Sequence, residues 1–127
     1  MKENRKQPRK NLISYSQVFD LYGARLLGYL ADITLLGAMV IGERTVEEDA
    51  AITLQIEVPE MEGVAVKRLN VPARVVWCKQ DISPEYYNIG FEFKEVKPEQ
   101  EKVIQAIIDT YEFKRKLPDY PFRASTK

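Results

Sequence analysis

The stretch ITLQIEV, residues 52–58, alternates apolar and polar side chains without a break. Successive side chains of a β-strand point to opposite faces, so this pattern predicts a strand with one face in a core and the other toward water. Residues 59–63 contain Pro59 and Gly63 and predict a turn directly after it. We therefore expect a fold built mainly from half-buried strands.

Runs rich in β-branched and aromatic residues predict further strands on both sides, at residues 11–20, 25–31, 38–41, 64–79 and 86–93. Residues 64–79 are long enough for one bent strand or two short ones. Pro72 argues against a central strand and favours a sheet edge or a bulge nearby. Alternation places Trp77 on the same face as Val75. Residues 42–51, which are rich in acidic side chains, predict a solvated loop.

The apolar period changes after residue 97. Pro98 suits a first helical position, and an apolar stripe at helical spacing follows it: Val103, Ile104, Ile107, Ile108 and Tyr111. The cations of residues 114–116 suit the end of such a helix, and Pro118 stops it. About six strands followed by one amphipathic helix predict a mainly β fold, a small antiparallel barrel or sandwich with the helix packed on it.

Composition narrows the function classes. The chain has 127 residues, 19 cationic and 19 acidic side chains and no histidine. One domain is expected at this length, and the balanced charge gives no overall attraction to a nucleic-acid polymer. The missing histidines remove the usual general base and the commonest zinc ligand, so we expect neither an enzyme nor a metal site.

The cellular location follows from three further features. No apolar run is long enough to span a bilayer, and no apolar segment follows the N-terminal charges as in a secretory signal. The single cysteine, Cys78, has no partner for an internal disulfide and lies in an apolar run, so we expect it to be packed. A cytoplasmic location is expected.

Two polar clusters carry possible chemistry. Arg5 and Arg9 lie four residues apart in a basic segment, and Asp32, Thr34 and Gly37 interrupt the apolar pattern between two predicted strands. Arginine forks bind phosphates or the O6/N7 edge of guanine, and a carboxylate accepts from the N–H groups of the opposite guanine edge. The structural alternative is a solvated terminus and a simple turn, in which Gly37 has a positive φ.

Together, Arg5-x-x-x-Arg9 and Asp32-x-Thr34-x-x-Gly37 resemble the paired signature of the PilZ domain family. Residues 75–77 and 89–93 also resemble later strands of that family. The resemblance implies a bacterial six-stranded antiparallel β-barrel with a C-terminal helix that binds cyclic dimeric GMP (c-di-GMP). It divides the chain into a flexible basic arm (1–10), the barrel and helix (11–116) and a flexible tail (117–127).

The resemblance also implies roles for single residues. Arg5 and Arg9 would contact guanine Hoogsteen edges and phosphates, Asp32 would accept from guanine N–H groups, Thr34 would hydrogen-bond the ligand, and Gly37 would permit the turn. Two positions depart from the family pattern. Thr34 replaces the usual serine, and the residue before the first arginine, which is linked to ligand stoichiometry, is Asn4.

The expected function is a c-di-GMP receptor that changes shape on binding and signals to a downstream protein. One alternative is a PilZ-like adaptor that acts without nucleotide. Another is a barrel that binds RNA or single-stranded DNA, but the basic residues gather at the two ends instead of among aromatic residues. We interpret Trp77, Tyr86 and Tyr87 as packing residues.

Overall fold

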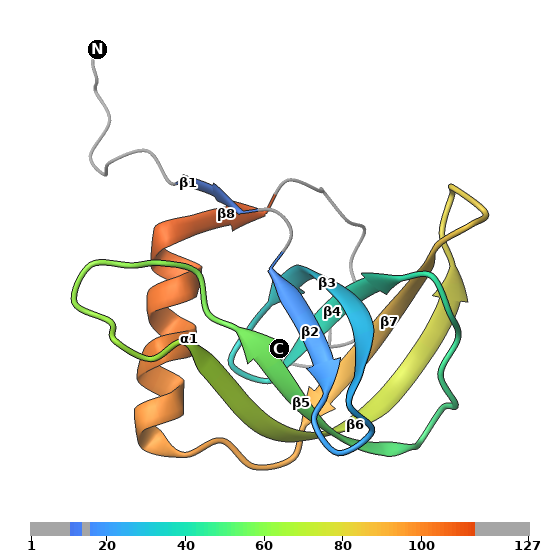
Figure 1. The fold of residues 1–127 in the computed structure, drawn as a ribbon, viewed down its shortest axis with the longest axis horizontal. Coiled ribbons are helices and arrows are strands. Elements are labelled where there is room, and N and C mark those ends of the chain that lie inside the picture. Colours follow the sequence, from blue (N-terminus) through green and yellow to red (C-terminus); the bar gives the residue numbers. More distant parts are fainter. Residues whose placement is uncertain (1–10, 14–15, 114–127) are drawn as a thin grey trace.

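The structure, a computed structural model, describes residues 11–13 and 16–113. These residues form the strands and the helix of Figure 1: β1 (Asn11–Ile13), β2 (Gln17–Asp20), β3 (Arg25–Ile33), β4 (Gly37–Gly42), β5 (Ala51–Glu57), β6 (Arg68–Gln80), β7 (Tyr87–Phe93), α1 (Pro98–Thr110) and β8 (Tyr111–Phe113). Six strands close into an antiparallel barrel in the order β2-β3-β4-β7-β6-β5. The predicted barrel and C-terminal helix are confirmed.

Closure of the barrel settles the position of Pro72. The strand that contains it, β6, is hydrogen-bonded to β5 on one side and to β7 on the other, so Pro72 is not at a sheet edge. The alternative expectation, a bulge nearby, is met between Val75 and Trp77, where the register with β7 shifts. The expected solvated loop at residues 42–51 is also largely present, between β4 and β5.

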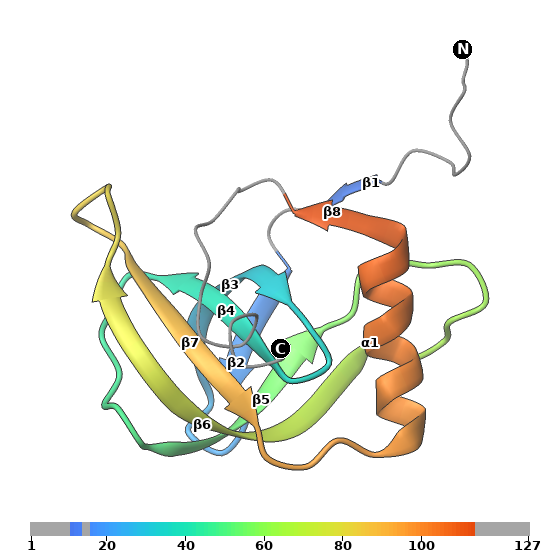
Figure 2. The ribbon, with the colours of Figure 1, turned by 180° about the vertical axis from the view of Figure 1, so that it is seen from behind.

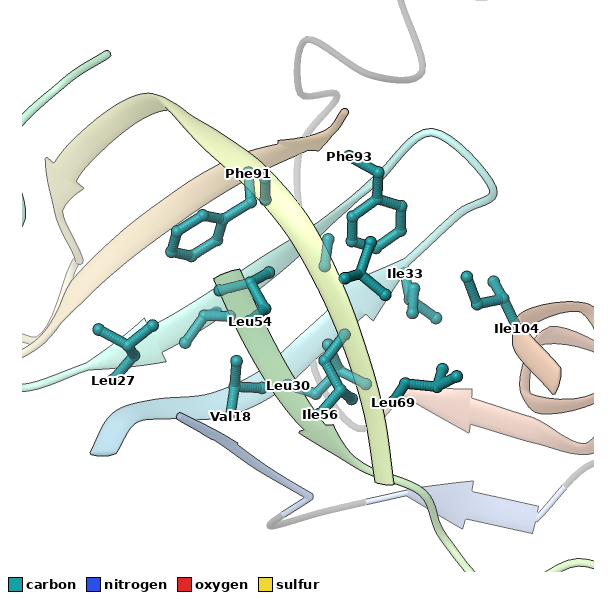
Figure 3. Packing of buried hydrophobic residues seen from close by; sticks show 14 of the residues in the cluster. Val18, Leu27, Leu30, Ile33, Leu54, Ile56, Leu69, Phe91, Phe93 and Ile104 are labelled. Atoms are coloured by element: carbon teal, nitrogen blue, oxygen red, sulfur yellow. The ribbon is translucent and has the colours of Figure 1, made fainter. Parts of the chain in front are cut away.

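Strict alternation builds the core. In β5, Ile52, Leu54 and Ile56 are buried while Thr53 and Gln55 are partly exposed, as residues 52–58 predict. The inner faces of the other strands supply the remaining apolar side chains, and Figure 3 shows Leu54, Phe91 and their neighbours filling the barrel. Fully burying one such side chain contributes about 1.5–3 kcal/mol, so the interior of the barrel dominates stability.

Helix α1 covers one open end of the barrel (Figure 2). Its Val103, Ile104 and Ile107 are buried in the same core cluster as the strands. Pro98 begins the helix as expected, and the Gln100 side chain accepts a hydrogen bond of 3.0 Å from the backbone N–H of Lys97. In the described part of the chain, no helix is long and apolar enough to cross a membrane.

The end of the helix differs from the prediction. We expected the helix to continue to the cations of residues 114–116, but it ends at Thr110 and the chain becomes extended at Tyr111. The Tyr111 hydroxyl donates to the backbone carbonyl of Glu60, and its ring packs on the core. This tertiary contact and the strand pairing of β8 replace further helical turns.

A second, two-stranded sheet connects the two ends of the described chain. β1 pairs in parallel with β8, with Asn11 opposite Tyr111 and Ile13 opposite Phe113 (Figure 1). The single strand predicted over residues 11–20 is therefore wrong. It is two strands, because β1 leaves the barrel to pair with β8 whereas β2 joins β3 and β5.

Candidate functional site

The turn between β3 and β4 is fixed by one hydroxyl group. Thr34 Oγ1 accepts hydrogen bonds from the backbone N–H groups of Leu36, at 3.1 Å, and Gly37, at 3.2 Å. The Thr34 backbone N–H donates to the Gly37 carbonyl at 2.8 Å. The turn is confirmed, but a positive φ at Gly37 is wrong, because the described glycines with positive φ are Gly28 and Gly63.

A bulge places Asp32 on the outer face of the barrel. Leu30 lies opposite Val40 but Asp32 lies opposite Met39, so β3 contains one extra residue, Ala31, at this point. Directly opposite residues share a face of the sheet, and Met39 packs with Ala31 outside the main core. The Asp32 side chain is buried, and its Oδ1 accepts from the Ile33 backbone N–H at 2.8 Å.

A second bulge, in β6 and three strands away in the barrel, does the same for Trp77. The register of β6 with β7 shifts between Val75 and Trp77, so Val76 and Trp77 both turn outward. The prediction that Trp77 shares the core face with Val75 is wrong for this reason. Cys78 then points back and packs on the main core, as expected for a packed cysteine.

The two bulges meet in one apolar cluster, which we call the outer patch: Ala31, Met39, Val76 and Trp77. Gly90 lies beneath the tryptophan, since a Cβ there would be 2.5 Å from Trp77 Cε2. Asp32 and Trp77 end one row of register partners that runs across β3, β4, β7 and β6. With neighbouring strands about 4.8 Å apart, this row is about 14 Å long.

A parallel row begins at Gly37. Its register partner in β7 is Glu92, and the partner of Glu92 in β6 is Arg74. The Arg74 guanidinium contacts Glu92 at 2.9 Å and Asp49 of the β4–β5 loop at 2.6 Å. Hydrogen bonds to Glu92 and then to Asp49 raise the pKa of Arg74 above its ordinary value. The row therefore ends in an ion-pair network that Arg74 forms with Glu92 and Asp49.

The structure thus brings together three of the five predicted site residues. Asp32, Thr34 and Gly37 lie within one bulge and turn. Arg5 and Arg9 lie outside the described residues. Sequence reasoning missed the outer patch, whose only signal is the adjacent pair Val75-Val76, where alternation breaks. Among the described residues, no group of three or more Cys, Asp or Glu side chains is placed to hold a metal ion.

Comparison with known proteins gives a consistent result. The family model of the PilZ domain matches residues 3–110. No curated protein matches the chain. The PilZ domain of YcgR from Escherichia coli, solved with c-di-GMP, is 18% identical, with a TM-score of 0.56 over 84% of this chain and 89% of that one.

The crystal structure of YcgR from Escherichia coli in complex with c-di-GMP is 20% identical, with a TM-score of 0.57 over 82% of this chain. The match covers 44% of that longer chain. At these identities the two structures show a shared fold, while the family match extends over most of the sequence. The chain belongs to the PilZ domain family.

Proposed function

We propose that this protein is a cytoplasmic bacterial receptor that binds c-di-GMP without catalysis and passes the signal to another protein. The observation that carries the proposal is the bulge at Ala31, which turns Asp32 to the outer face in the row that ends at Trp77. The family match supports it, because residues 3–110 include both Arg5 and Arg9. Two structures of YcgR that share this fold, one of its PilZ domain and one of a longer chain, were solved with c-di-GMP.

The chemistry of the outer face suits a ligand with guanine bases. The carboxylate of Asp32 is an acceptor for the N–H groups of a guanine edge, and Arg5 and Arg9 supply forked donors for O6/N7 and phosphate. Trp77 is partly exposed at the other end of the row. Stacking of a base on an aromatic ring contributes about 1–3 kcal/mol, so this end of the row favours a second contact with the same ligand.

Thr34 has a double role in this proposal. Its oxygen already accepts two backbone N–H groups of the turn, while the contact with the Gly37 carbonyl is long, at 3.5 Å. A hydroxyl has one proton to donate, and a donor–acceptor distance of 3.5 Å makes the hydrogen bond from Thr34 to the Gly37 carbonyl a weak one. We propose that Thr34 shapes the turn with its lone pairs and donates this proton to the ligand.

The small sheet offers a route from the ligand to a partner. β1 begins two residues after Arg9 and pairs with β8, which directly follows α1. We propose that residues 1–10 act as an arm that closes over the ligand and displaces β1, β8 and the end of α1. Each arm residue that becomes ordered costs about 1–2 kcal/mol of backbone entropy, so the arginine contacts must exceed this cost before binding is seen.

Calorimetric titration of the full chain with c-di-GMP tests the proposal. We expect saturable binding that weakens at least tenfold, about 1.4 kcal/mol, in both Arg9→Ala and Asp32→Ala. Arg68→Ala and Glu48→Ala are matched controls, because both side chains are exposed and lie at the start of β6 and in the β4–β5 loop, which follows the end of β4 opposite the turn. Both should bind like the unchanged protein.

The fluorescence of Trp77, the only tryptophan in the chain, gives a second readout at the outer patch. Its emission should change with the same midpoint as the heat signal. An absence of heat, thermal shift and fluorescence change at high nucleotide concentration contradicts the proposal and favours the nucleotide-independent adaptor. If Arg9→Ala binds c-di-GMP with the same affinity as the unchanged protein, Arg9 does not contribute to the ligand site.

A further inference from the structure

A surface groove of about 370 Å³ lies at the other end of the β3–β4 hairpin. Its lining comes from the start of β3, the end of β4, residues 43–46 and Tyr86. Figure 2 shows that the β3–β4 turn lies on the side of α1, whereas the end of β4 runs to the opposite side of the barrel. The groove is therefore a different surface from the proposed nucleotide site.

Two glycines form the floor of this groove. Gly28 lies against the backbone of the end of β4, and a Cβ on it would be 2.1 Å from the Ile41 carbonyl oxygen. A Cβ on Gly42 would likewise be 2.1 Å from the Leu27 carbonyl oxygen. Because neither residue has a side chain, the two strands approach closely and leave open space above them.

The walls combine apolar surface with positive charge. Leu26 is 44% exposed and Tyr86 36% exposed, so each presents apolar area to the groove. Arg25 is half exposed and its Nε is 3.7 Å from Asp20, a loose contact. Arg44 is exposed and has no ion pair with any described residue. The lining residues thus include two arginines, Arg25 and Arg44, and one acid, Glu43.

Exposed apolar side chains also lie on two turns next to lining residues in the chain. Tyr22, in the turn before β3, is 82% exposed, and Ile82, in the β6–β7 hairpin that contains Tyr86, is 95% exposed. Exposed apolar side chains that gather around a concave site mark interaction surfaces. A small anion would use only the arginines, whereas an extended chain would also cover the apolar side chains on both flanking turns.

We propose that this groove docks an extended acidic segment of another protein, with one apolar side chain inserted between Leu26 and Tyr86. Carboxylates on either side of that anchor pair with Arg25 and Arg44, and the glycine floor lets the inserted side chain lie close to the backbone. The site requires no contact with Asp32, Thr34 or Gly37. Docking therefore goes beyond nucleotide binding and is testable without c-di-GMP.

The test uses short synthetic peptides and the amide NMR spectrum of the ¹⁵N-labelled full chain. The probe has one Phe between Asp and Glu residues. It should shift the amide signals of Gly28, Gly42, Thr45 and Tyr86 in a saturable way. Two control peptides, one with Lys in place of every acid and one with Gly in place of Phe, should bind at least tenfold more weakly.

Variants separate the groove from general charge effects. Arg44→Glu and Tyr86→Ala should each weaken the acidic peptide at least tenfold, while Arg68→Glu, the same charge change at the start of β6, should leave binding unchanged. The spectrum of each variant also reports whether it is folded. No shift at the groove amides, equal binding of the Lys peptide, or unchanged binding by a folded Arg44→Glu variant would overturn the proposal.

Discussion

Glycines leave room near both ends of the β3–β4 hairpin, at Gly90 of β7 and at the pair Gly28 and Gly42, but the room is used differently. Near the turn, the space over Gly90 is filled by the ring of Trp77, which packs with Met39. At the other end, Gly28 and Gly42 stand against backbone, and the space above them stays open as a groove. Gly90 makes room for a side chain, whereas Gly28 and Gly42 leave an open groove.

The difference shows which neighbour fixes each glycine. At Gly28 the close neighbour is the Ile41 carbonyl, which belongs to a strand bonded on both sides and is not free to move. At Gly90 the close neighbour is the end of a side chain, which has other rotamers. A substitution at Gly28 should therefore disturb the backbone and cost more stability, whereas one at Gly90 should move only the Trp77 side chain and cost less.

The largest effect is expected for Gly28→Ala. Its φ of +153° is unfavourable for alanine, and its new Cβ would lie 2.1 Å from the Ile41 carbonyl oxygen. Overpacking costs about 1–3 kcal/mol and the backbone conformation about 1–2 more. We expect urea denaturation to show a loss of about 3 kcal/mol or more, or no folded protein at all.

Gly63→Ala is the matched control for that measurement. Its φ of +80° is also unfavourable for alanine, but nothing lies within 4 Å of the new Cβ. It should cost about 1–2 kcal/mol from backbone conformation alone. Equal losses in the two variants would mean that the close approach of β3 to β4 contributes nothing.

A smaller effect is expected for Gly90→Ala. The added methyl group displaces the Trp77 ring instead of the backbone, so we expect a cost of about 2 kcal/mol with an intact barrel. Tryptophan emission should shift to longer wavelength as the ring becomes more exposed, and c-di-GMP affinity should fall with it. Unchanged emission would show that the ring is not held over Gly90.

The sequence was sufficient to predict the strands whose side chains alternate strictly. Residues 52–58 gave β5 and its buried face directly, because a period of two has a single interpretation when polar and apolar residues alternate. The bulge before Trp77 was not predictable, since Val75-Val76 fits either face. Nor was the bulge at Ala31, which decides where Asp32 points and depends on the register with β4.

The ends of α1 make the same point. Pro98 marks the start of the helix through its own covalent geometry, so the start was predicted correctly. The end was predicted wrongly, because Tyr111 continues the apolar stripe in sequence but is held in an extended conformation by Glu60 and β1. A helix end that is set by neighbouring residues in the sequence could be predicted, whereas one that is set by contact with a distant strand could not.

The smallest effect is expected for Thr34, where Thr34→Val removes the hydroxyl but keeps the shape of the side chain. Two backbone N–H groups lose their acceptor, but that of Leu36 reaches water, so the loss of stability should be about 1 kcal/mol. Thr34→Ser keeps the hydroxyl and should stay within about 0.5 kcal/mol of the unchanged protein.

Calorimetry on the same pair asks whether the hydroxyl also serves the ligand. If Thr34 donates to c-di-GMP, Thr34→Ser should keep the affinity and Thr34→Val should lose it by more than its change in stability explains. If both variants bind equally well, the hydroxyl only shapes the turn. The threonine in place of the family's serine would then be a substitution at a structural position, and Asp32 would remain as the proposed ligand contact of this turn.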